Sequence, residues 1–174
     1  NGLCAGCAMT ALLFIGFSSG LIYDSMLVLL IGAMIGFLFF NLLIVGKKID
    51  VFLGDHGSNM IGFWVEWNTI YASQTEIYQI DPMTMIWFVA IPLLDCIGLI
   101  ISRRKRGISW TTPGRDHIHH KLMNRFSPEG TLVIILLISI SLSSFGLIIE
   151  KIGASYTSSS LFFIFAVVYY FFAY

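Results

Sequence analysis

Charged residues are scarce in this chain. Only 11% of its 174 residues are charged and 57% are hydrophobic, whereas a soluble domain has about 25% charged residues. Ten acidic residues balance ten basic ones, so the formal net charge is zero. The composition therefore excludes an ordinary soluble domain and gives no bulk attraction for nucleic acid. We expect a lipid bilayer, and no nucleic acid, as a partner.

Cysteine is also scarce. Three cysteines do not make a disulfide framework. Cys4 and Cys7 form a C-x-x-C, but the pair opens an apolar segment and has no second pair to complete a zinc site. No basic residues precede the first apolar run, so a secretory signal peptide is not indicated either.

Apolar runs long enough to cross a membrane fill most of the chain. A helix needs about 20 apolar residues to cross a bilayer, and runs that are continuous rather than alternating favour helices over strands. We therefore predict an all-α fold, a polytopic transmembrane helix bundle in a single membrane domain over residues 1–174. The six predicted spans are residues 3–22, 26–45, 58–72, 83–102, 131–149 and 158–174.

The basic residues predict the orientation of this bundle. Nine of the ten lie in two polar loops, residues 46–57 and 103–130. Two predicted spans separate these loops, so both face the same side of the membrane. By the positive-inside rule that side is cytoplasmic.

The first polar loop contains Gly54-Asp55-His56-Gly57-Ser58. A carboxylate in a glycine-rich turn can bind Mg²⁺, which prefers oxygen ligands, and glycines let the backbone approach a ligand closely. The alternative is that Asp55 caps a helix beginning near Ser58. Local sequence favours the cap, and the two roles are compatible because a helix N-terminus attracts anions.

The second polar loop contains His117-Ile118-His119-His120, which holds three of the four histidines of the chain. Neutral imidazoles can bind a transition metal, but residues at i, i+2 and i+3 do not share one helix face. A single zinc ion held by all three is therefore disfavoured. Histidine can instead donate hydrogen bonds to a phosphate or a sugar, or act as an acid or base.

Three further features carry functional hypotheses. The basic run 103–106 favours a role in topology and headgroup contact, with one arginine free to bind a substrate phosphate. Asp95 and Glu66 lie at predicted membrane depth, where ionisable residues are functional candidates. We rank Asp95 higher because it follows Pro92 and lies about two turns from the cytoplasmic end of its predicted span.

Residues 51–58 (V-F-L-G-D-H-G-S) resemble the F-M-G-D-x-G-S loop of the polyprenyl-phosphate N-acetylhexosamine-1-phosphate transferases. The H-I-H-H sequence at 117–120 resembles the histidine motif of that family, and I-P-L-L-D at 91–95 fits its pattern. The resemblance implies transfer of N-acetylglucosamine-1-phosphate from UDP-N-acetylglucosamine to undecaprenyl phosphate, with release of UMP. It implies a bacterial inner membrane and a first step in lipid-linked envelope polysaccharide synthesis. Homo-oligomer formation is left open.

The resemblance also assigns roles to residues. Asp55 corresponds to an aspartate that holds Mg²⁺ or Mn²⁺, which would neutralise the pyrophosphate. The assigned residues are catalytic Asp55, His119 and His120, and substrate-binding His117, Arg103 and Asn41.

Two departures from the family pattern stand out. The family's adjacent aspartate pair would precede residue 1, and Asn1 and Cys4 stand where a D-G-x-D-G motif has aspartates. We therefore expect the C-terminal part of a larger transferase bundle, inactive when isolated. Two alternatives remain: a catalytically dead membrane protein, as a remnant or assembly partner, and a membrane zinc enzyme that uses the histidine motif.

Overall fold

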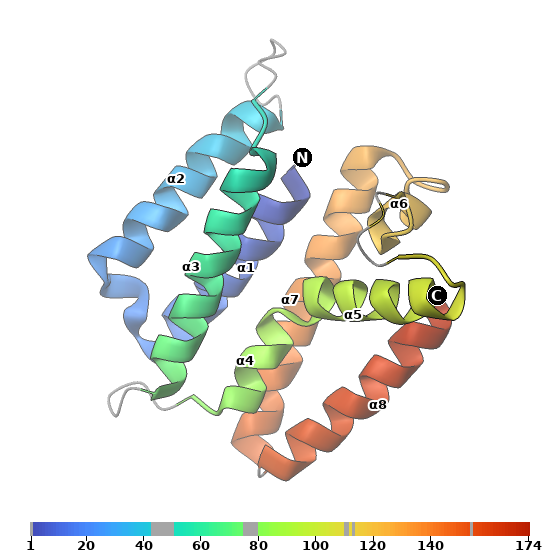
Figure 1. Cartoon of the computed structure of the whole chain (residues 1–174). Coiled ribbons are helices and arrows are strands. Elements are labelled where there is room, and N and C mark those ends of the chain that lie inside the picture. The colour runs from blue at the N-terminus through green and yellow to red at the C-terminus, as the bar shows by residue number, and fades with distance from the viewer. Residues whose placement is uncertain (1, 43–50, 75–79, 110–111, 113, 154) are drawn as a thin grey trace.

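The computed structural model describes residues 2–42, 51–74, 80–109, 112, 114–153 and 155–174 (Figure 1). Every regular element in this part of the chain is helical, which confirms the predicted all-α fold. The elements are α1 (Gly2–Ser19), the 3₁₀ turn η1 (Leu21–Tyr23), α2 (Ser25–Asn41), α3 (Gly54–Gln74), α4 (Pro82–Phe88), α5 (Ala90–Lys105), α6 (Ile118–Leu122), α7 (Pro128–Ile152) and α8 (Ser155–Ala173).

Side-chain caps set the start of several helices. The Asp24 carboxylate accepts hydrogen bonds from the backbone N–H groups of Met26 (2.9 Å) and Leu27 (3.1 Å) at the start of α2. The Ser127 hydroxyl accepts from the Gly130 N–H at 3.1 Å at the start of α7. Such caps satisfy backbone donors that have no partner inside the helix.

Helix α1 lies at the centre of the bundle. It packs against α2, α3 and α7, while α4 packs against α7 and α8 (Figure 1). Small residues such as Ala5 and Ala11 are buried along α1 and allow close helix approach. Leu12 and Ile15 are fully buried between these helices, so the core of the bundle forms around α1.

Three described helices are long and apolar enough to cross a membrane: α1, α7 and α8. They confirm three of the predicted spans and make the chain a membrane protein. The apolar α2 is shorter, at 17 residues. Helix α3 has 21 residues, but polar side chains such as Asp55, Asn59 and Glu66 interrupt it and it does not qualify as a span by composition.

The predicted span over 83–102 is broken rather than continuous, and its two helices pass as a span only when taken together. The chain forms α4 and α5 there, and their axes differ by 80°. Pro92 has no N–H to donate to the Phe88 carbonyl, and its ring disfavours a continuous helix at that point. Val89, between the two helices, leaves the helical region with φ −112° and ψ 16°. Consequently α5 crosses α7 rather than running alongside it (Figure 1).

A glycine turn ends α5 and reverses the chain. Gly107 has φ 69°, a conformation that costs glycine little. The Ile108 N–H donates to the Arg103 carbonyl at 3.0 Å and the Gly107 N–H donates to the Arg104 carbonyl at 3.2 Å, the hydrogen-bond pattern of a Schellman motif. The following segment therefore returns over α5 and leads into α6.

The two predicted polar loops are partly helical. Helix α3 already begins at Gly54, and the second loop contains α6 together with the end of α5 and the start of α7. Lys47 and Lys48 lie outside the described residues. The cytoplasmic placement of both segments stays a prediction.

Candidate functional site

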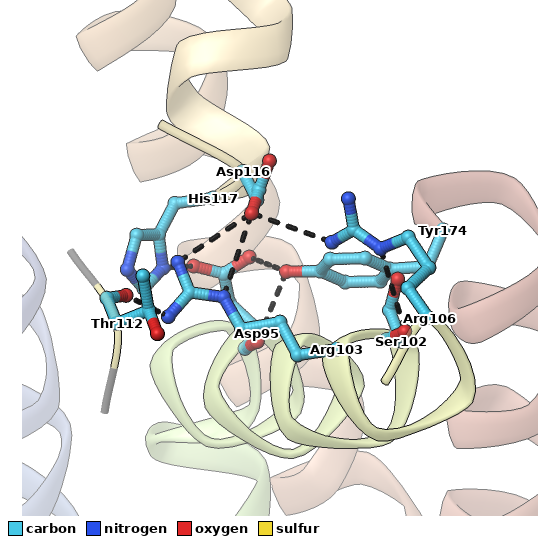
Figure 2. Close-up of polar contacts among 8 residues, drawn as sticks. All are labelled: Asp95, Ser102, Arg103, Arg106, Thr112, Asp116, His117 and Tyr174. Carbon is cyan, nitrogen blue, oxygen red and sulfur yellow. Dashed lines mark hydrogen bonds and ion pairs between the residues drawn. The ribbon is translucent and has the colours of Figure 1, made fainter. Parts of the chain in front are cut away.

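Asp95 joins α5 to the histidine segment (Figure 2). The residue is buried, at 8% exposure. Its Oδ2 atom lies 2.8 Å from Nδ1 of His117, and its Oδ1 atom accepts a hydrogen bond from the Ile118 N–H at 2.9 Å. Because Ile118 is the first residue of α6, this carboxylate caps that helix from outside.

Tyr174 reaches the same carboxylate from the end of α8. Its hydroxyl lies 2.5 Å from Asp95 Oδ1 and 3.0 Å from the Asp95 carbonyl oxygen (Figure 2). The ring covers Gly98, where an added Cβ would lie 2.6 Å from a ring carbon. Lys121 of α6 places its ammonium 3.9 Å from the ring centroid, a cation–π distance. The three helices α5, α6 and α8 therefore meet at Asp95 and Tyr174.

Arg103 holds the segment between α5 and α6 in place. It is 4% exposed, donates to the Thr112 carbonyl, and places Nε 3.4 Å from Asp116 Oδ2. A Cβ on Gly114 would lie 2.5 Å from Arg103 Nη2, so glycine there lets the backbone approach the guanidinium. The predicted role of Arg103 in binding substrate phosphate stays a prediction, and its guanidinium already makes these internal contacts.

Asp116 is shared between two arginines. Arg106 Nη2 lies 3.3 Å from the same Oδ2 atom that Arg103 contacts. Desolvation alone would raise the pKa of Asp116, but the positive charges of Arg106 and then Arg103 lower the pKa below its ordinary value. Asp116 is therefore ionised and ties the polar segment to α5 through both arginines.

The three histidine rings lie close together. The His117 and His119 rings are stacked, with centroids 5.6 Å apart, and the His119 and His120 rings lie 4.1 Å apart. Partial burial lowers the pKa of His119, and the neighbouring His120 and His117 lower it further, while Asp95 opposes this. The lowered pKa favours the neutral form of His119, which can both donate and accept a hydrogen bond.

A groove of about 730 Å³ opens beside the histidine segment. Its walls come from α1, α3, α5 and α7, and most lining side chains are apolar. Its polar side chains include Asp95, His117 and His119, and Cys4 of α1 lines it too. Cys4, one of the two positions where the sequence resemblance leads us to expect aspartates, lies in the wall of the same cavity as the histidines. Asn1, the other position, lies outside the described residues.

The end of α2, which carries Asn41, and the start of α3, which carries Asp55, lie at the same end of the bundle as α6 (Figure 1). Asp55 is exposed in the first turn of α3, which begins at Gly54, so it is not the cap of a helix beginning near Ser58. Asn41 ends α2 and donates from Nδ2 to the Val51 carbonyl at 2.7 Å. In the part of the chain that the structure describes, no hydrogen bond or ion pair links Asp55 or Asn41 to the histidines.

The side chains that could bind a metal ion fit Mg²⁺ in part and give no arrangement for zinc among the described residues. Among the described residues, no three His, Cys, Asp or Glu side chains are arranged to hold a metal ion. This gives the zinc-enzyme hypothesis no support, and Asp95 already engages His117 Nδ1. Mg²⁺ is usually bound through one or two carboxylates together with water and substrate phosphates, and the exposed Asp55 offers one such ligand.

Sequence reasoning selected Asp95 for its depth in an apolar run but did not identify its partners. It did not select Tyr174, which is 79 residues from Asp95. No local pattern could pair them, because their contact depends on the bend that turns α5 toward the end of α8.

Comparisons with known proteins show what the chain is similar to. Residues 1–73 match the sequence model of glycosyl transferase family 4. Undecaprenyl-phosphate alpha-N-acetylglucosaminyl 1-phosphate transferase of Escherichia coli K12 is 37% identical over 122 residues, which is 70% of this chain and 33% of that protein. The protein of the same name from Yersinia pestis is 36% identical over 124 residues, 71% of this chain and 34% of that protein.

A third relative of that name, from Pasteurella multocida, is 40% identical over 78 residues, 45% of this chain and 22% of that protein. The chain thus spans about a third of the length of the first two relatives. No solved structure matches it. Residues 1–73, which contain the first polar motif, are thus similar to glycosyl transferase family 4.

Proposed function

We propose that this chain provides part of the active site of a membrane transferase that moves N-acetylglucosamine-1-phosphate from UDP-N-acetylglucosamine to undecaprenyl phosphate. The observation that supports this most is the stacked pair of His119 and His117, the latter held by Asp95, in the wall of an apolar groove. The relatives' names supply the acceptor and the transferred sugar.

In the proposed reaction, an oxygen of undecaprenyl phosphate attacks the phosphorus attached to the sugar. The bond from that phosphorus to the bridging oxygen breaks, and UMP leaves with the bridging oxygen and its electron pair. Phosphoryl transfer depends mainly on positioning and on stabilising the charge of the phosphates. A polyprenyl chain suits the apolar wall of the groove, and its phosphate suits the end that carries His117 and His119.

Each site residue has a proposed part in this step. His119 and His120 donate hydrogen bonds to phosphate or sugar oxygens. His117 binds the substrate beside them. Asp55 is one ligand for Mg²⁺ or Mn²⁺, which when bound supplies charge neutralisation for the pyrophosphate. Arg103 and Asn41 support the phosphate and nucleotide sides of the site through the backbone segments that they hold. The site would face the cytoplasm of a bacterial inner membrane.

A second candidate is a catalytically inert membrane protein, and one residue favours it. Cys4 lies in the groove where the family resemblance places an aspartate. A thiol replaces a carboxylate there and removes an oxygen ligand that a hard cation prefers. We propose that the isolated 174-residue chain releases no UMP for this reason and because it spans only part of its relatives.

A chimera distinguishes the two candidates. In the chimera, the 122 matching residues of the Escherichia coli K12 relative are replaced by the corresponding residues of this chain. UMP release is then measured in membranes that contain no other transferase of this kind. Release that depends on both substrates supports the transferase. No release from the chimera, with release restored by Cys4→Asp, supports the inert protein. If neither the chimera nor its Cys4→Asp variant releases UMP, the proposed activity of these residues is rejected.

A further inference from the structure

We propose that Asp95 is a positioning residue that fixes the ring orientation and the tautomer of His117, leaving Nε2 of that ring as a hydrogen-bond acceptor. Only the catalytic consequence of this inference rests on the proposed function. The tautomer itself is a property of the folded chain and can be measured without any reaction.

The hydrogen-bond arrangement determines the tautomer. An ionised carboxylate can only accept hydrogen bonds. Asp95 Oδ1 accepts from the Ile118 N–H and the Tyr174 hydroxyl, and Oδ2 lies 2.8 Å from His117 Nδ1. Nδ1 must therefore carry the proton that it donates to Oδ2. In the neutral imidazole the other nitrogen, Nε2, then has a free lone pair.

The support for this carboxylate is rigid. Asp95 is buried, at 8% exposure, on a helix whose direction is set by the break at Val89. The three donors come from two other elements, α6 and the end of α8, at sequence separations of 22 to 79 residues. Such outer partners hold a working histidine in one orientation and tautomer.

A purely structural role is the alternative, in which Asp95 only caps α6 through the Ile118 N–H. Asp95→Asn separates the two roles, because an amide has one acceptor atom and one donor group of nearly the same shape. Two donors meet at the Oδ1 position, so the amide oxygen stays there and keeps the cap. The NH₂ group then faces His117 Nδ1, which must give up its proton, and the ring changes to the Nε2–H tautomer.

Nitrogen NMR of the chain with ¹⁵N-labelled histidine, in nanodiscs at about pH 8 where imidazole is neutral, measures this directly. His117→Gln assigns the signal. We expect Nδ1–H in the native protein and Nε2–H in Asp95→Asn, with the Ile118 amide signal retained. Glu129→Gln, the same change at an exposed carboxylate in α7, should leave His117 unchanged.

Two results would overturn the inference. One is an Nε2–H tautomer in the native protein, a result that needs no variant to fold. The other is an unchanged His117 in a folded Asp95→Asn protein, which would leave only the cap.

The catalytic consequence is measured as UMP release by the chimera described above. Asp95→Asn should lower kcat for UMP release at least about tenfold, with a smaller change in KM for UDP-N-acetylglucosamine. If the tautomer changes but kcat does not, the positioning holds and the proposed role of His117 fails. If kcat falls without a change of tautomer, the positioning inference fails.

Discussion

The Tyr174 hydroxyl lies 2.5 Å from Oδ1 of Asp95, so the end of α8 is hydrogen-bonded to the middle of α5. The bond is partly buried, and its partners lie 79 residues apart. Loss of a donor to a buried carboxylate costs about 1–3 kcal/mol.

Tyr174→Phe should therefore lower the free energy of unfolding by about 1–3 kcal/mol. The ring still covers Gly98, so the change removes only the hydroxyl. The measurement is denaturant unfolding of the purified protein in mild detergent. Tyr156→Phe is the matched control, because Tyr156 is 85% exposed and should change stability little. Equal stability of the two variants would mean that the Asp95–Tyr174 bond adds nothing.

Gly146 of α7 lies against Trp87 of α4. A Cβ on Gly146 would lie 2.7 Å from Trp87 Cβ, and Trp87 is only 1% exposed. Since both atoms lie close to the backbone, the helices must separate, and Gly146→Ala should cost about 1–3 kcal/mol.

Gly36→Ala is the control for this change, since a Cβ on Gly36 of α2 meets nothing within 4 Å. Alanine there should stabilise the helix by up to about 1 kcal/mol. Thermal unfolding of both variants compares them. Destabilisation by Gly36→Ala equal to that by Gly146→Ala would contradict the α4–α7 packing.

His119 should titrate with a pKa below 6.5, its ordinary value. Burial and the neighbouring histidines disfavour its charged form. Below about pH 6.5 the unfolded chain takes up this proton before the folded chain does, so His119 lowers stability as the pH falls from there toward its folded pKa. Above about pH 6.5, His119 does not change the stability with pH. An NMR titration gives the pKa, and a value above 6.5 would contradict the burial of this ring.

Gly107→Ala should lower stability by about 1 kcal/mol, because alanine is strained at φ 69°. Gly62→Ala in α3, where an added Cβ meets nothing within 4 Å, is the matched control. Unfolding midpoints at equal protein concentration provide the comparison. A neutral effect at Gly107 would argue against the glycine turn that ends α5.

The helices could be predicted from continuous apolar runs, because a bilayer demands that backbone groups bond internally. For this reason the predicted span 131–149 lies within the observed helix α7. The bend at Val89 could not be predicted in the same way. Pro92 signals a break, but the 80° angle depends on how α5 packs against α7.

The candidate site likewise has residues that the sequence reveals and contacts that only the fold reveals. The cluster 117–120 and Asp55 were visible as polar residues in an apolar sequence. The Asp95–His117 contact could only be found in the fold, because it requires the Gly107 turn to return the chain over α5. The internal contacts of Arg103 were also hidden in the sequence: its basic run suggested headgroups or phosphate, which stays a prediction, and only the fold shows that its buried guanidinium contacts Thr112 and Asp116.

The most direct test of the proposed transferase site is UMP release by the chimera carrying Asp55→Asn. Asp55 is exposed, so the change should leave the fold intact, while loss of one anionic ligand weakens a bound Mg²⁺. We expect turnover at saturating substrates to fall at least about a hundredfold, since a misplaced reacting group can cost that much, while Glu129→Gln keeps the activity of the parent chimera. Near-normal turnover of Asp55→Asn in an active chimera would contradict the proposed site.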